Sequence, residues 1–172
     1  KVLVAVPRSN ILRNMLVETD ILPQLAERGY NVLHITSKLG AYVNHTKVNR
    51  EKFFDTLTSW GRDPLKKFVI FHYSILSEGI NVSGLTHCIL LRNQSVVSMA
   101  QTVGRVIRLH PDDATDIANG VIPRGQLQLY RKPTGYVTIP IHKNHGKRTL
   151  TRLQRVVDEI FIQGIPATAY VG

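Results

Sequence analysis

The feature that most constrains the fold is the alternation of short apolar runs with segments of helical periodicity. The runs Val2–Val6, Tyr30–Ile35, Lys67–Phe71 and Thr86–Leu91 have the length and composition of strands covered on both faces. Helical patterns between such runs are typical of parallel βαβ units. The sequence therefore predicts an α/β fold in three layers, with a mainly parallel sheet flanked by helices.

Cap and turn residues bound the expected helices. Ser9 or Asn10 is expected to cap the first helix, which Pro23 interrupts. Gly29 then offers a stop for the interrupted helix. Ser95 is expected to cap the helix that follows the last buried strand.

The remaining segments are expected to be less regular. Residues 37–48 are polar and contain glycine, which favours a loop, and residues 110–125 look irregular. The alternation from Leu127 to Arg131, the turn residues 132–135 and the apolar run Tyr136–Ile141 favour a hairpin. The expected organisation is one domain at 1–172, with a loop and hairpin insertion at 110–148 and a C-terminal helix at 149–163.

The charge balance indicates a polyanionic partner. Lys and Arg number 22 against 12 Asp and Glu, which gives a net charge of +10. Nucleic acid is the first candidate for that partner, and an anionic membrane surface is the second. A basic protein with no polyanionic partner is the alternative.

Cysteine usage and hydropathy point to the cell interior. The single Cys88 excludes an internal disulfide, fits a reducing compartment and is expected to be a buried, inert thiol. No apolar run approaches the roughly 20 residues that span a bilayer, and no secretory signal is recognisable. Because the chain opens at Lys1 directly on a strand pattern, we expect it to be a fragment of a longer protein.

Basic and polar residues follow several of the predicted strands. In an open parallel sheet, ligands gather at the carboxyl ends of the strands. Pro7-Arg8, Tyr73–Asn81 and Arg92–Gln94 all leave such ends, and the helix that carries Gln101 begins after the last of them. We therefore expect these groups to converge on one edge of the sheet.

The segment Gln101–Arg108 places two arginines, Arg105 and Arg108, three residues apart. At that spacing both guanidiniums can project from one side of a helical turn. Arginine is always charged and forks onto phosphate oxygens. The pair therefore suits a nucleoside triphosphate.

These segments carry a family resemblance. A strand, the turn Ser77–Val82, a second strand and a helix ending Gln-x-x-Gly-Arg-x-x-Arg resemble motifs V and VI of superfamily 2 helicases. Val6–Arg8 falls where motif IV would lie. Within the superfamily, the chain most resembles phage UvsW-type DNA helicases. The resemblance covers residues 1–110 best and implies the RecA-like fold of P-loop NTPases, specifically the second, C-terminal RecA-like domain.

The resemblance implies roles for the motif VI residues. Arg108 would be the arginine finger that reaches the γ-phosphate held by another RecA-like domain. Arg105 would contact phosphate or orient the finger. Gln101 would hold the nucleotide or bridge to the partner domain, and Gly104 belongs to the same nucleotide-binding motif.

The resemblance also implies roles in motif V. Gly79 would let the backbone turn closely, and Asn81 would contact the ribose or the facing domain. Glu78 is assigned to the same nucleotide site, with a solvated turn residue as the alternative.

Nucleic-acid contacts are expected from Arg8, Ser37, Tyr73 and Ser74. Many relatives carry a threonine, which touches a strand phosphate, where this chain has Tyr73. A tyrosine can stack on a base or donate to phosphate. The alternative is an aromatic residue that only covers the end of a strand.

Half of an ATPase site is missing from the sequence. No Gly-x-x-x-x-Gly-Lys-Ser/Thr phosphate loop and no acidic magnesium motif occur. The resemblance therefore implies that ATP with Mg²⁺ is bound mainly by an N-terminal RecA-like domain of the same full-length chain. Alone, this chain is expected not to hydrolyse ATP at a useful rate.

No metal site is expected in this chain. His142 and His145 are not accompanied by cysteine or carboxylate ligands. Asp112, Asp113 and Asp116 are interpreted as a solvated loop. Basic side chains near the C-terminus would track a DNA backbone or form a solvated helix face: Lys143, Lys147, Arg148, Arg152 and Arg155.

The function predicted from these features is the C-terminal motor domain of an ATP-dependent DNA helicase or translocase. Its nucleic-acid partner would be DNA, or alternatively RNA, bound without sequence preference. It would work in the cytoplasm, including that of a phage-infected bacterial host. The alternatives are a non-catalytic nucleic-acid-binding module and the motor part of a restriction or remodelling translocase.

Overall fold

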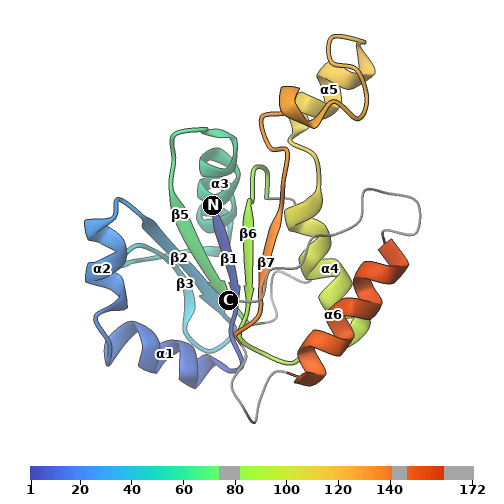
Figure 1. Cartoon of the computed structure of the whole chain (residues 1–172). Coiled ribbons are helices and arrows are strands. Elements are labelled where there is room, and N and C mark those ends of the chain that lie inside the picture. Colours follow the sequence, from blue (N-terminus) through green and yellow to red (C-terminus); the bar gives the residue numbers. More distant parts are fainter. Residues whose placement is uncertain (74–81, 141–146, 161–172) are drawn as a thin grey trace.

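The structure, a computed structural model, describes residues 1–73, 82–140 and 147–160 (Figure 1). Its sheet has seven strands in the order β4-β3-β2-β5-β1-β6-β7. The strands are β1 (Val2–Ala5), β2 (Asn31–Thr36), β3 (Gly40–Val43), β4 (Thr46–Val48), β5 (Phe68–His72), β6 (His87–Leu90) and β7 (Tyr136–Thr138). The helices are α1 (Ser9–Val17), α2 (Ile21–Glu27), α3 (Arg50–Arg62), α4 (Val96–Ile107), α5 (Pro111–Ala118) and α6 (Lys147–Ile160), with a 3-10 turn, η2, at Leu127–Leu129.

The predicted parallel sheet is confirmed in its centre. Strand β1 pairs in parallel with β5 on one side and with β6 on the other, so that Val2 faces both Val69 and His87. Strand β2 continues the parallel arrangement beyond β5. Every residue of β5 is buried, as expected for a strand covered on both faces.

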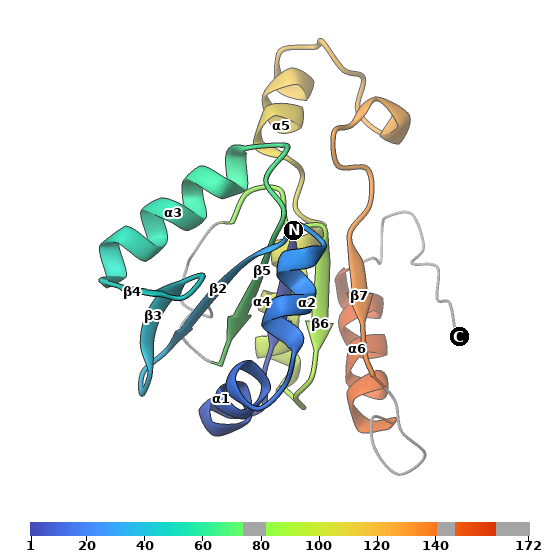
Figure 2. The same ribbon diagram turned by 90° about the vertical axis from the view of Figure 1, so that its left-hand side faces the viewer.

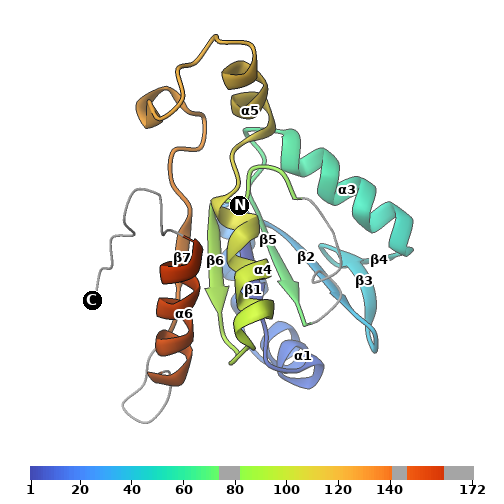
Figure 3. The same ribbon diagram turned by 90° about the vertical axis from the view of Figure 1, so that its right-hand side faces the viewer.

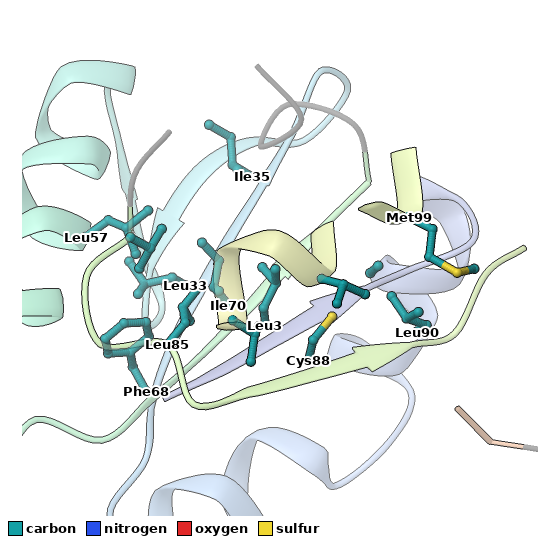
Figure 4. Close-up of a cluster of buried hydrophobic side chains, with 14 of the residues drawn as sticks. Leu3, Leu33, Ile35, Leu57, Phe68, Ile70, Leu85, Cys88, Leu90 and Met99 are labelled. Atoms are coloured by element: carbon teal, nitrogen blue, oxygen red, sulfur yellow. The ribbon is translucent and has the colours of Figure 1, made fainter. Parts of the chain in front are cut away.

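Two apolar clusters separate the three layers. Helices α1 and α2 pack on one face with Val4, Val6 and Phe71 (Figure 2). Helices α3 and α4 share the larger cluster on the other face, and α6 packs beside α4 (Figure 3). The side chains of the larger cluster interlock between the sheet and α4 around Leu3 and Met99 (Figure 4). The predicted three-layer α/β fold is confirmed.

The helix boundaries agree with the sequence in part. Ser95 caps α4 by accepting a hydrogen bond from the Ser98 backbone N–H, as predicted. The cap predicted for α1 is wrong, because Arg8 is its N-cap residue and makes no side-chain cap bond. The predicted break near Pro23 separates α1 from α2 but falls before the proline, at residues 18–20.

Residues 37–48 are not a plain loop. They contain β3 and β4, which extend the sheet as an antiparallel pair beside β2. Asn44 makes the turn between them with a positive φ of 53°, a conformation that asparagine tolerates better than most residues. Only Ala41 of this pair is buried, so its apolar signal is short.

The region after α4 also differs from the prediction. Residues 111–118 form α5, which begins with proline and is capped by the side chain of His110. Residues 127–129 form the 3-10 turn, and β7 pairs in parallel with β6, so the predicted hairpin is wrong. In every view α5 stands beyond the end of the sheet where β1 begins (Figure 1).

The helix predicted at 149–163 corresponds to α6, which begins at Lys147; residues 161–163 lie outside the described residues. None of the helices within the described ranges combines the length and hydrophobicity needed to cross a membrane.

Candidate functional site

Four segments of the predicted site lie at the carboxyl edge of the sheet. Ser37 follows β2, Tyr73 follows β5, Arg8 follows β1 and Arg92 follows β6. Because these strands are adjacent and parallel, the four residues occur side by side in that order. Arg8 and Ser37 are exposed. The structure thus places three residues predicted to contact nucleic acid on one edge, together with Arg92, which was also expected there.

Tyr73 and Arg92 contact each other across the end of β1. The Arg92 guanidinium carbon lies 5.3 Å from the centroid of the Tyr73 ring, a cation–π geometry. Both side chains are half-buried. Burial lowers the pKa of Arg92, while the nearby Tyr73 raises it. Tyr73 therefore places an aromatic ring against a cation at this edge.

The loop between β6 and α4 is held from two sides. Arg152 on α6 donates to the Asn93 side-chain oxygen and to the Gln94 carbonyl oxygen, both at 2.7 Å. The Gln94 side-chain oxygen accepts from the Thr102 hydroxyl at 3.2 Å, inside α4. Helix α6 and helix α4 together thus fix the backbone that carries Arg92.

His72, the last residue of β5, was not singled out in the sequence. Its side chain is buried, and neither ring nitrogen has a hydrogen-bond partner among the described residues. Burial, together with smaller effects of the Arg92 and Arg105 charges, lowers its pKa to about 3. The imidazole is therefore neutral at physiological pH and lies within electrostatic reach of both arginines.

Arg105 and Arg108, the two arginines assigned to motif VI, differ in exposure. Arg105 on α4 is 8% exposed, whereas Arg108 is exposed. The helix ends at Ile107, and Arg108 has a non-helical ψ of 142°, so the expected single helical turn does not contain both residues. Burial, and then the charge of Arg108, lowers the pKa of Arg105. The two charges are near each other even though their exposure differs.

The expected convergence on one edge is only half correct. Helix α4 starts at the carboxyl edge and runs back across the sheet. This direction follows from Lys132, whose Nζ donates both to the carbonyl oxygen of Val106, near the end of α4, and to that of Leu85, which precedes β6. Its 12 residues span roughly 18 Å. Arg108 therefore lies toward the opposite edge from Arg8 and Tyr73. Helix α4 connects the two groups of residues.

The other motif VI residues remain accessible. Gln101 is exposed on α4. A Cβ built on Gly104 would meet no atom within 4 Å, so the chain itself does not require glycine there. Both positions therefore leave space beside the helix.

Several predicted residues fall outside the described part. Ser74, Glu78, Gly79 and Asn81 lie in residues 74–81, and His142 and His145 lie in residues 141–146. Within the described ranges there is no group of three or more metal-ligating side chains.

The interpretation of Asp112, Asp113 and Asp116 as a solvated loop is wrong for the backbone, which forms α5, but Asp112 is exposed as predicted. Asp113 is completely buried and accepts from the Arg131 backbone N–H and from the Arg131 guanidinium at 2.9 Å. Asp116 accepts from the same guanidinium at 2.7 Å. Lys132 adds a backbone N–H to Asp113. Their role is to join α5 to the segment that leads into β7.

A cavity of about 420 Å³ lies apart from these groups, under α1 and α2. Its lining is apolar and contains none of the motif residues: Val2, Val4, Met15, Ile21, Leu25, Tyr30, Val69, Phe71, Ile89 and Leu91. Its chemistry does not suit a phosphate-bearing ligand.

No protein-family model and no curated protein matches the chain. Two of the solved structures that resemble it cover most of its length. The C-terminal domain of the DEAD-box protein Dbp5 has a TM-score of 0.51 at 11% identity, over 93% of this chain and 69% of that chain. The ATP-dependent Type ISP restriction-modification enzyme LlaBIII bound to DNA also has a TM-score of 0.51, at 13% identity, over 91% of this chain but only 10% of that chain. At such identity the likeness shows the fold, that of RecA-like helicase C-terminal domains.

Proposed function

We propose that this chain is the C-terminal RecA-like motor domain of an ATP-dependent DNA helicase or translocase. The observation that carries the proposal is the exposed Arg108 at the end of α4, with the charge of Arg105 close behind it. The fold supports it, because the chain resembles the C-terminal domain of a DEAD-box protein. The whole of residues 1–172 would act as one domain, with 110–148 as an insertion and 149–163 as its last helix.

The nucleotide site would be completed by two domains. An N-terminal RecA-like domain of the same full-length chain would hold ATP and Mg²⁺ through its phosphate loop. Arg108 would reach the γ-phosphate and stabilise the charge that develops on it during transfer. Arg105, being buried, would orient Arg108 by repulsion and packing. Gln101, Gly104, Glu78, Gly79 and Asn81 would line the same cleft.

This chain's donors fit a triphosphate. Arg108 and Gln101 are exposed N–H donors, and no salt bridge between Arg108 and a carboxylate occurs within the described ranges. Guanidinium forks match phosphate oxygens. Bound ATP would supply the phosphoryl group that is transferred to water once the two domains have closed around it, and the residues named here would bind and orient it.

The nucleic-acid track would follow the carboxyl edge of the sheet. Arg8, Ser37, Tyr73 and Ser74 would contact one strand through its phosphates and bases, without reading sequence. Helix α4 runs from this edge toward Arg108, so a displacement of the residues that hold the strand would be transmitted through α4 to the nucleotide site. DNA is the proposed strand, with RNA as the alternative. Such an enzyme would work inside the cell.

Two finer assignments rest on sequence motifs and on one neighbour. The UvsW-type assignment, with its phage host, rests on residues 73–82 and 101–108. The restriction-translocase alternative is favoured by the likeness to a Type ISP enzyme that binds DNA. The two would differ in the nucleic acid that stimulates ATPase activity: branched DNA for a UvsW-type enzyme and linear duplex for a restriction motor.

The test is ATPase activity with and without nucleic acid. The chain joined to its own upstream phosphate-loop domain should hydrolyse ATP, and single-stranded or branched DNA should stimulate hydrolysis. The chain alone should bind nucleic acid without hydrolysing ATP. Absence of ATP hydrolysis, with DNA and RNA alike, would leave the non-catalytic binding module as the better description.

A further inference from the structure

Arg92 has an environment that calls for an anion. Its side chain is half-buried, and its Nε is buried without a hydrogen-bond partner among the described residues. The salt bridges within the described ranges belong to His110 and Arg131, and none involves Arg92. Taking a cation out of water without an anionic partner is costly. Its one stabilising contact there is the ring of Tyr73.

The surroundings of Arg92 are basic as well. Arg8 follows the neighbouring strand β1 and is exposed. Arg152 is bonded to the backbone two residues after Arg92, and Arg148 lies one turn earlier on α6 and is exposed. A row of cations from β1 to α6 at one edge of the sheet attracts a polyanion more strongly than any one of them.

The loop that carries Arg92 is also fixed in place. Arg152 bonds Asn93 and Gln94, and Ser95 caps α4 immediately afterwards. Gln94 is 4% exposed, and its Nε2 donor has no partner among the described residues. A fixed backbone and a ring beneath the guanidinium reduce the entropy that Arg92 loses on binding.

We propose that Arg92, stacked on Tyr73, is a phosphate-binding residue that extends the nucleic-acid track across the end of β1 toward α6. This inference rests on the proposed function, because it assumes that a strand passes this edge. The ligand chemistry is a phosphate oxyanion, which a nucleic-acid backbone or a free phosphate could supply. The guanidinium would donate to the phosphate oxygens from the N–H groups at its edge, while the Tyr73 ring packs against one face.

The experiment measures binding of a fluorescein-labelled, mixed-sequence oligodeoxynucleotide to the chain by anisotropy, between about 50 and 200 mM salt. The variants are Arg92→Gln and Arg92→Lys. Arg124→Gln is the matched control, because it also removes one positive charge, from an exposed residue in the segment between α5 and η2. Competition by inorganic phosphate at constant ionic strength separates a free-phosphate site from a strand site.

We expect Arg92→Gln to weaken binding about tenfold, the loss of one charge-assisted hydrogen-bond pair. The slope of log affinity against log salt should fall by about 0.7 for a single strand. Arg124→Gln removes one charge far from the proposed contact, so it should change the affinity and the slope much less than Arg92→Gln does. Inorganic phosphate should compete no better than chloride.

Three results would overturn the inference. They are an Arg92→Gln affinity and slope equal to those of Arg124→Gln, displacement of the strand by inorganic phosphate at low concentration, and wild-type affinity in Arg92→Lys. Arg92→Lys keeps the positive charge but loses the forked pair of N–H donors, so it should keep the salt slope and bind several-fold more weakly. If Arg92→Gln does not fold, the result for Arg92→Lys decides. Absence of binding by the wild-type chain would instead contradict the nucleic-acid part of the proposed function.

Discussion

Arg105 and Arg108 are three residues apart, and after burial itself the charge of Arg108 is what lowers the pKa of Arg105. Arg105 is 8% exposed inside the domain, while Arg108 is exposed beyond the last turn of α4. The Arg105 guanidinium is therefore held inside the domain, whereas the Arg108 guanidinium is exposed to solvent. Like charges so close repel each other, and a bound anion would relieve that repulsion.

Replacing Arg108 by alanine should abolish ATP hydrolysis in a protein that carries this chain together with its phosphate-loop domain. Loss of an arginine finger lowers turnover by about 10³–10⁵-fold. DNA affinity should stay near the wild-type value, because Arg108 lies far along α4 from the carboxyl edge. Steady-state ATPase assays and anisotropy titrations check both. Near-normal turnover in Arg108→Ala, with Arg124→Ala as the surface control, would rule out the finger.

Nucleic-acid binding by the chain alone should be weak, indifferent to sequence and steeply dependent on salt. Phosphate contacts release counterions, so affinity falls linearly with salt on logarithmic axes. The net charge of +10 and the basic carboxyl edge supply those contacts. Titrations with unrelated oligonucleotides at several salt concentrations measure the slope. An affinity that is the same at low and high salt would contradict a phosphate-tracking edge.

Asp113→Asn should destabilise the fold by about 2–3 kcal/mol, because a buried carboxylate that accepts from Arg131 and Lys132 is replaced by a neutral amide. Asp116→Asn is the control: its ion pair with Arg131 is partly exposed and should contribute less than about 1 kcal/mol. Urea unfolding of both variants at neutral pH makes the comparison. Equal effects would show that burial of Asp113 does not matter.

The same carboxylate should give an acid-dependent signature. Burial by itself raises the pKa of Asp113, but hydrogen bonds from Arg131 and Lys132 outweigh it and hold the pKa below the ordinary 3.8. Its contribution to stability is therefore present above about pH 3.8 and is lost as the pH falls below that value. The stability gap between wild type and Asp113→Asn should narrow in that range.

Lys132 should produce a second pH dependence of the same sign, in the alkaline range. Its Nζ donates to the carbonyl oxygens of Val106 and Leu85, and burial lowers its pKa from 10.5 to about 8, against a smaller opposing effect of Asp113. Between these pH values the unfolded chain binds the proton and the folded chain does not, so stability should rise with pH. Lys132→Met should lack this rise when unfolding free energies are compared from pH 8 to 10. A constant difference from wild type would mean that Lys132 stays charged when folded.

Gly135→Ala should destabilise the junction between α4 and β7. A Cβ at this position would lie 2.6 Å from the Val106 carbonyl oxygen, so the backbone must shift. Such overpacking costs about 1–3 kcal/mol. Gly104→Ala is the matched control, since its Cβ meets nothing within 4 Å and alanine favours a helix. In thermal unfolding, the Tm of Gly135→Ala should lie below that of wild type, and the Tm of Gly104→Ala should lie above it.

The central strands and α4 were predictable because each carries a signal within its own residues. Strand β5 is an unbroken apolar run, and Ser95 precedes the amphipathic face of α4. Strands β3 and β4 were missed because they are short and bury one side chain, Ala41. Helix α5 was missed although Pro111 and the acidic first turn are helix-start signals, since the following glycine and proline outweighed them.

The pairing of β7 and the environment of Arg92 could not be predicted locally. Strand β7 joins β6 in parallel because the segment before it is fixed to α4 and α5 through Lys132 and Asp113, which are far apart in sequence. The stacking of Arg92 on Tyr73 depends on three adjacent strand ends. The edge placement of Arg8, Ser37 and Tyr73 was predictable, since it needs only parallel strands.

The segment beyond α4 stands clear of the sheet (Figure 1). Lys132 ties it to Leu85 and Val106, and Asp113 joins its two halves by accepting from Arg131. Residues 119–125 at its far end are almost all exposed, and Gly120 and Gly125 have positive φ values. A dye, biotin or short tag inserted there would leave the core, the carboxyl edge and α4 untouched. Residues 119–125 thus give a site for attaching the protein to a surface in single-molecule measurements.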